Sequence, residues 1–183
     1  MNQYDGVFLI GFGGPTPGCC KRLDPCPGDE ALCFVRCIVG ANNMNRVEEV
    51  AKHYNEFGGF SPFNELTFKQ AAALKDVLKK QKLDLPVYVG MRNWPPFFGE
   101  IMEQMVADGS RNVIGIILSS FQSSASWERY QQEVQDVVNT LGNGSPVVHY
   151  IEPWYEEDGF VDAVTDLIRS SCLGWSYERF KKA

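Results

Sequence analysis

The sequence predicts an α/β domain: an open parallel sheet with helices on both faces, in a doubly wound arrangement. Short apolar runs alternate along the chain with segments that repeat apolar residues at helical spacing. The runs are continuously apolar, which is typical of strands buried on both faces. The alternation itself favours a parallel sheet joined by helical crossovers. No repeat or low-complexity tract interrupts residues 1–183, so we expect a single domain.

The expected elements follow one another along the whole chain. Strands are predicted at residues 5–11, 86–90, 113–118 and 147–151. Helices are predicted at residues 31–39, 46–57, 67–82, 96–108, 126–141 and 159–171. Residues 16–30 are rich in proline, glycine and cysteine, which indicates irregular structure between the first strand and the first helix.

Glycines and short polar residues mark where the predicted helices end and begin. Gly58 and Gly59 follow one helix and Gly109 follows another, at positions where a positive φ lets the chain leave the helix. Asn64 or Thr67 is expected to cap the helix after the double glycine through a side-chain oxygen. The stretch between these two helices is therefore predicted to be a tight turn.

Composition limits the classes of partner. The 183 residues are 44% hydrophobic and 22% charged, as in ordinary globular proteins, and the net charge is −6. An acidic chain is a poor general binder of nucleic acid or of anionic membranes, so we expect no nucleic-acid partner. No run is long and apolar enough to span a membrane, and the N-terminus shows no signal-peptide pattern. We therefore expect a cytoplasmic protein, with peripheral membrane contact left open.

Cysteines are concentrated near the N-terminus. Cys172 stands alone, and the other five are Cys19, Cys20, Cys26, Cys33 and Cys37. Cys33 and Cys37 are four residues apart, which places them on one face of a helix. The chain has no Cys-x-x-Cys pair, the usual spacing of a metal site. We interpret Cys33 and Cys37 as small buried hydrophobes and the other three as loop residues, with a zinc or iron–sulfur site as the alternative.

Parallel sheets bind ligands at the carboxyl ends of their strands. This rule selects residues 12–15, 92–98, 119–126 and 152–155 as the ligand-facing loops. The loop after the second strand contains Arg92 beside Asn93 and Trp94. A guanidinium among aromatic side chains indicates an acidic ligand group, because it binds a carboxylate through paired hydrogen bonds. The alternative is a salt bridge from Arg92 to Glu100 or Glu103.

Four stretches, in the same order as in a known family, carry a resemblance over nearly the whole chain. Residues 58–62, Gly-Gly-Phe-Ser-Pro, resemble the Gly-Gly-x-Ser-Pro motif of the ferrochelatases. Residues 7–15 resemble the first strand and loop of that family, and residues 88–97 resemble its second strand and porphyrin-side loop. Residues 154–163 resemble the segment before the last helix of its N-terminal half. The resemblance implies a chelatase-like fold in which residues 1–183 form the N-terminal half.

The resemblance also implies a porphyrin site. A porphyrin needs flat apolar walls, with cationic or hydroxyl groups at the rim for its propionates. Porphyrin-binding positions fall on Phe12, His53, Tyr54, Ser61, Arg92, Asn93, Trp94 and Tyr130. Some relatives have a tyrosine at the Phe12 position, near the metal; a phenylalanine cannot ligate. The other histidine, His149, is interpreted as structural.

The family's catalytic histidine and glutamate are expected to lie beyond Ala183, so no catalytic or metal-ligating residue is assigned. Removal of two pyrrole protons needs a general base. We therefore expect the 183-residue chain to be inactive without a C-terminal half.

The resemblance implies a haem-biosynthesis enzyme, a lyase that inserts Fe²⁺ as its substrate metal into protoporphyrin IX or coproporphyrin III. The alternative is a non-catalytic tetrapyrrole-binding module. A third possibility, insertion of cobalt or nickel into a related tetrapyrrole, fits Gly-Gly-x-Ser-Pro less well.

Overall fold

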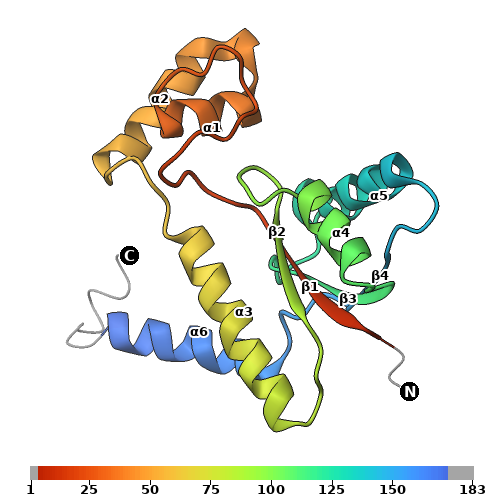
Figure 1. Ribbon diagram of the computed structural model, residues 1–183. Helices are drawn as coiled ribbons and strands as arrows, with labels where there is room; N and C mark the ends of the chain where they lie inside the picture. Colours follow the sequence, from red (N-terminus) through yellow and green to blue (C-terminus); the bar gives the residue numbers. More distant parts are fainter. Residues whose placement is uncertain (1–3, 173–183) are drawn as a thin grey trace.

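The computed structural model describes residues 4–172 and contains one parallel sheet with helices on both sides (Figure 1). The strands are β1 (Gly6–Gly11), β2 (Val87–Met91), β3 (Asn112–Ile117) and β4 (Val147–Tyr150), in the order β2-β1-β3-β4. The helices are α1 (Glu30–Val39), α2 (Met44–Glu56), α3 (Phe63–Lys80), α4 (Phe98–Ala107), α5 (Arg129–Leu141) and α6 (Asp158–Ser171). The predicted fold is confirmed.

Strand β1 lies at the centre of the sheet and sends alternate side chains to opposite faces. All six of its residues are buried. Phe8 and Ile10 belong to the core that α4 and α5 cover. Val7 and Leu9 belong to a second core on the other face, under α3. A strand buried on both faces has no solvent-facing side, which explains why its sequence is continuously apolar.

Helices α1 and α2 form a separate pair that stands away from the sheet (Figure 1). They pack on each other around a third core, which contains Phe34 of α1 and Val47 of α2. Trp94, from the loop after β2, also belongs to this core and ties the pair to the sheet.

The glycine turns are confirmed, whereas the predicted cap of α3 is wrong. Gly58 and Gly59 have φ values of 89° and 81°, in the left-handed region that glycine tolerates. Helix α3 begins at Phe63, directly after Pro62, so Asn64 and Thr67 lie inside it. The Asn64 side chain instead accepts a hydrogen bond from the Gly14 backbone N–H at 2.8 Å. Asn64 is a residue type that often caps helices, but the sequence did not show that its side chain would bind the distant Gly14 instead.

Helices α5 and α6 differ from the other helices that flank the sheet. The helix predicted at 126–141 begins later, at Arg129, after one turn of π-helix at Ser124–Glu128. Helix α6 has no buried residue. None of the helices in residues 4–172 has both the length and the apolar character needed to cross a membrane.

Candidate functional site

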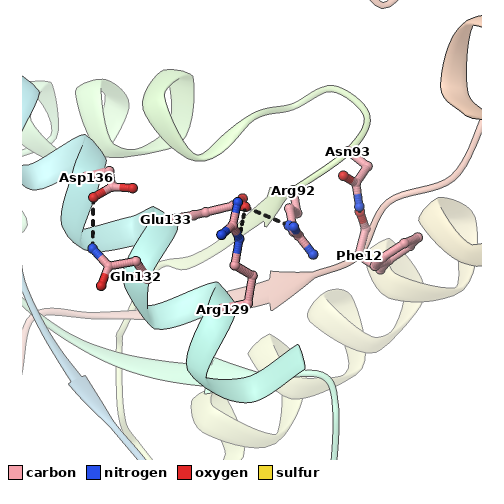
Figure 2. A network of polar contacts seen from close by, with 7 residues as sticks. All are labelled: Phe12, Arg92, Asn93, Arg129, Gln132, Glu133 and Asp136. Carbon is pink, nitrogen blue, oxygen red and sulfur yellow. Dashed lines mark hydrogen bonds and ion pairs between the residues drawn. The ribbon is translucent and has the colours of Figure 1, made fainter. Parts of the chain in front are cut away.

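The loops that follow β1 and β2 meet at the carboxyl edge of the sheet, as the topology predicts. The backbone N–H of Arg92 donates to the Gly11 carbonyl, and that of Asn93 donates to the Phe12 carbonyl, both at 2.9 Å. The buried Asn93 side chain donates a second hydrogen bond to the Phe12 carbonyl at 3.1 Å (Figure 2). Asn93 therefore fixes the backbone of Phe12, a residue that remains 37% exposed.

Arg92 points toward the first turns of α5, where it meets an acidic and an aromatic residue (Figure 2). Its Nε–H donates to Glu133 Oε1 at 2.9 Å, and Arg129 Nε–H donates to the same oxygen at 2.8 Å. The guanidinium carbon of Arg92 lies 5.9 Å from the centre of the Tyr130 ring. Two guanidinium groups thus share one carboxylate, which leaves this group of side chains with an excess positive charge.

The alternative of a salt bridge from Arg92 to Glu100 or Glu103 is wrong. Glu100 instead accepts a hydrogen bond from the Phe97 backbone N–H at 2.9 Å, at the start of α4. The real partner, Glu133, is 41 residues away in sequence. Among the contacts of residues 4–172, the Arg92 side chain donates a hydrogen bond through Nε alone, so its outer nitrogens can serve a ligand.

Tyr130 supplies a neutral hydroxyl beside Arg92. Its side chain is buried, with a relative exposure of 4%. Burial raises the pKa of Tyr130 to about 12, and the nearby Arg92 charge offsets only part of that effect. The phenol is therefore protonated at neutral pH, beside an arginine that keeps its charge.

The Gly-Gly-x-Ser-Pro turn packs directly against the loop after β1. The Ser61 backbone N–H donates to the Pro15 carbonyl at 2.8 Å. A Cβ added to Gly14 would lie 2.5 Å from the Ser61 Cβ, a distance that side chains do not tolerate. Glycine at position 14 is thus required by close approach, and two of the stretches that carry the family resemblance are in contact.

A second group of predicted residues lies beside this turn. His53, Tyr54 and Ser61 line a cavity of about 270 Å³ together with Phe57, Phe60 and Pro62. His53 is exposed and Tyr54 is half-buried. Burial also raises the pKa of Tyr54, so its hydroxyl remains neutral.

Phe34, which the sequence analysis missed, joins the two groups. Its ring packs edge-to-face against Phe12 and Tyr54, with ring centres 6.2 Å and 5.6 Å apart. It also contacts Trp94 at 6.1 Å. Trp94 is 3% exposed and its indole N–H donates to the Thr16 hydroxyl at 2.8 Å, so it supports the site from behind. The helical pattern of residues 31–39 gave no signal that Phe34 would face two ligand loops.

The loops after β3 and β4 add a further aromatic surface. The rings of Phe121 and Tyr155 stack with centres 5.3 Å apart and an interplanar angle of 14°. Both line a cavity of about 530 Å³ together with Glu152 and Glu156. Together with α2, the carboxyl edge therefore offers aromatic walls, two neutral phenols, and two guanidinium groups that share one carboxylate. This combination suits a flat apolar ligand with acidic groups at its rim.

The chain is similar in sequence to known proteins over most of its length. A sequence model of the family described as Ferrochelatase matches residues 30–179. A Ferrochelatase of Rhodopirellula baltica is 32% identical over 185 residues, covering 99% of this chain and 50% of that relative. A Coproporphyrin III ferrochelatase of Streptomyces coelicolor is 31% identical, covering 92% of this chain and 44% of that relative. A Coproporphyrin III ferrochelatase of Corynebacterium diphtheriae is 34% identical over 134 residues, covering 73% of this chain and 34% of that relative.

The chain spans about half the length, or less, of the curated relatives that it matches. The match nevertheless covers most of the chain, including the Gly-Gly-x-Ser-Pro turn, the loop that carries Arg92 and the helix that carries Tyr130. On these grounds the chain belongs to the ferrochelatase family.

Proposed function

We propose that this chain forms the porphyrin-binding part of a ferrochelatase, which inserts Fe²⁺ into protoporphyrin IX or coproporphyrin III during haem biosynthesis. The observation that carries the proposal is the arrangement of Arg92, Tyr130 and the exposed Phe12 ring at one edge of the sheet. Each of these groups matches one chemical feature of the ligand. A porphyrin is a flat aromatic ring with propionates at its rim.

In this proposal the aromatic side chains bind the macrocycle and the polar ones orient it. Phe12, supported by Phe34, offers an apolar face to the ring. Arg92 binds a propionate through its outer nitrogens, because a guanidinium pairs two N–H groups with the two carboxylate oxygens. The neutral Tyr130 hydroxyl donates to the same group, and desolvation of the pair strengthens both hydrogen bonds.

The general base is proposed to come from outside the 183 residues. Metal insertion removes two pyrrole protons, and a carboxylate or imidazole near the ring must accept them. The relatives are about twice as long as this chain, so a C-terminal half is proposed as the partner that supplies this base. The 183-residue chain alone is then expected to bind porphyrin without inserting iron.

Fluorescence titration of the purified chain with coproporphyrin III and protoporphyrin IX tests the binding step. We expect saturable binding of at least one of them, and clearly weaker binding of the corresponding methyl esters, because esterification removes the charge that Arg92 recognises. Equal binding of acid and ester would contradict the assignment of Arg92.

An anaerobic assay with Fe²⁺ and the same porphyrins tests the catalytic step. No turnover is expected from the chain alone. Turnover at the rate of a full-length relative would refute the assignment of the base to another segment. Binding without turnover, even after addition of the C-terminal half of the Rhodopirellula baltica relative, would favour the non-catalytic tetrapyrrole-binding module.

A further inference from the structure

Three cysteines that are separated in sequence lie close together in space at α1. Cys20 comes from the irregular segment before the helix, and Cys33 and Cys37 come from α1 itself. Their Sγ atoms all lie within 4.8 Å of one another, and those of Cys20 and Cys33 are 2.8 Å apart. Cys20 and Cys33 are buried, and Cys37 is half-buried. Cys20 lies in irregular chain, as expected, but its thiol is inside the α1–α2 core.

The same place has room for an ion. Cys20 and Cys33 line a cavity of about 120 Å³ together with Cys19 and Cys26. The Sγ atoms of Cys19 and Cys26 lie 3.5 Å apart. A volume of this size exceeds the roughly 10–15 Å³ that one water molecule needs.

The segment that carries Cys20 buries little of itself. Cys20 is the only buried residue between Thr16 and Asp29, and this span contains no helix or strand. Its other contacts are made at the surface or half-buried: Leu23 packs partly buried against the α1–α2 core, Arg22 lies 4.6 Å from the centre of the Phe97 ring, and the Gly18 N–H donates to Glu30 Oε1 at 3.1 Å. One buried thiol contributes little burial energy to set against the conformational entropy of ordering such a segment. A cross-link to α1 would supply what apolar packing does not.

We propose that Cys20, Cys33 and Cys37 bind one zinc ion and thereby fasten residues 16–29 to α1. Sulfur ligands about 2.3 Å from a tetrahedral zinc lie about 3.8 Å from each other. This spacing is within the 4.8 Å limit that contains the three Sγ atoms here. The Cys20 and Cys33 sulfurs move apart by about 1 Å when the ion enters. Zinc takes its fourth ligand from the side of the cavity. Cys26 is exposed and lines that cavity. This proposal does not depend on porphyrin binding.

A reactive thiol is a poorer explanation of the cluster. Nucleophilic cysteines have a lowered pKa and are accessible. Burial instead raises the pKa of the Cys33 and Cys37 thiols. A disulfide between Cys20 and Cys33 is the remaining competitor, and it would leave Cys37 without a role.

Cobalt and zinc titrations of the reduced 183-residue chain under anaerobic conditions test the proposal. We expect one equivalent of Co²⁺ to produce sulfur-to-cobalt charge-transfer absorption and the d–d bands of a tetrahedral site, and Zn²⁺ to displace it. We also expect one bound zinc to protect three or four of the six thiols from a thiol reagent. Equal reactivity of all six with and without zinc would overturn the proposal.

Single variants locate the ligands. Cys37→Ser, at the least buried of the three positions, is expected to weaken zinc binding by at least about 100-fold in a chelator competition, more than the loss typical of an outer-shell partner. Cys172→Ser, at the far end of the chain, is the matched control and should leave the affinity unchanged. Equal affinity in wild type and Cys37→Ser would remove Cys37 from the site. A native mass two hydrogens lower, with Cys20 joined to Cys33 and no zinc uptake after reduction, would replace the metal site by a disulfide.

Discussion

Replacement of Arg92 by alanine is the sharpest test of the site, because the structure separates its effect on binding from its effect on stability. Removal of Arg92 leaves Glu133 paired with Arg129, so no carboxylate is left without a partner. The ion pair is about one-fifth exposed on each side. Because Glu133 keeps its bond to Arg129, we expect a loss of only about 1 kcal/mol in the free energy of unfolding, the net contribution of one hydrogen bond.

The expected loss of porphyrin affinity is larger. A hydrogen bond to a charged group contributes about 1.5–3 kcal/mol, which corresponds to a roughly 10- to 150-fold rise in Kd. Arg129→Ala is the matched control, since Arg129 binds the same oxygen but its side chain is 55% exposed. The assay is a porphyrin fluorescence titration of all three proteins, with a thermal melt of each. Equal porphyrin affinities of wild type and Arg92→Ala would remove Arg92 from the site. A large loss of Tm with unchanged binding would mean that Arg92 has a structural role.

Three more predictions concern residues around this site. Glu133→Gln should strengthen porphyrin binding about threefold, because it removes roughly 0.6 kcal/mol of repulsion between the Glu133 carboxylate and a propionate about 7 Å away. Weaker binding in the same titration would mean that the main effect of Glu133 is to orient Arg92. Gly14→Ala should lower the free energy of unfolding in urea by roughly 1–3 kcal/mol, because its Cβ meets Ser61 at 2.5 Å. Gly99→Ala, where a Cβ meets nothing within 4 Å, is its control and should be neutral or stabilising. Burial raises the pKa of Tyr130 from 10.0 to about 12, so the folded state holds its proton more tightly than the unfolded chain. The stability from this residue is present below pH 10 and falls by up to about 1.4 kcal/mol per pH unit between pH 10 and 12. Plots of the free energy of unfolding against pH, measured for wild type and Tyr130→Phe, should therefore differ in slope between pH 10 and 12 only. Parallel plots in that range would contradict the raised pKa of Tyr130.

The fold could be predicted from the sequence because its signals are local. A strand such as β1, buried on both faces, must be apolar at every position, and this shows in a run of six residues. The edge of the sheet that carries the ligand loops follows from strand polarity alone. Arg92 and Asn93 were found by this rule, and the structure places both against the loop after β1.

The partners of these residues could not be predicted, because they come from distant segments. Glu133 is 41 residues from Arg92, and Asn64 is 50 residues from Gly14. The sequence also does not distinguish an aromatic loop residue that stays exposed, as Phe12 does, from one that is buried in the core, as Trp94 is. Only the packing of α1 against both loops shows that Phe34 supports the site.

The separate core of the α1–α2 pair has a consequence for cooperativity. Its buried side chains are not shared with the two cores of the sheet, and Trp94 and Phe12 are the points where the loops of the sheet reach it. Units with separate cores open through subglobal unfolding at a lower free energy than the whole molecule. Amide hydrogens in α1 and α2 should thus exchange with solvent well before those of β1. Under the proposed function, one wall of the porphyrin site would detach and reform while the sheet stays folded, and a rigid, bulky ring would have a route in and out that does not require global unfolding.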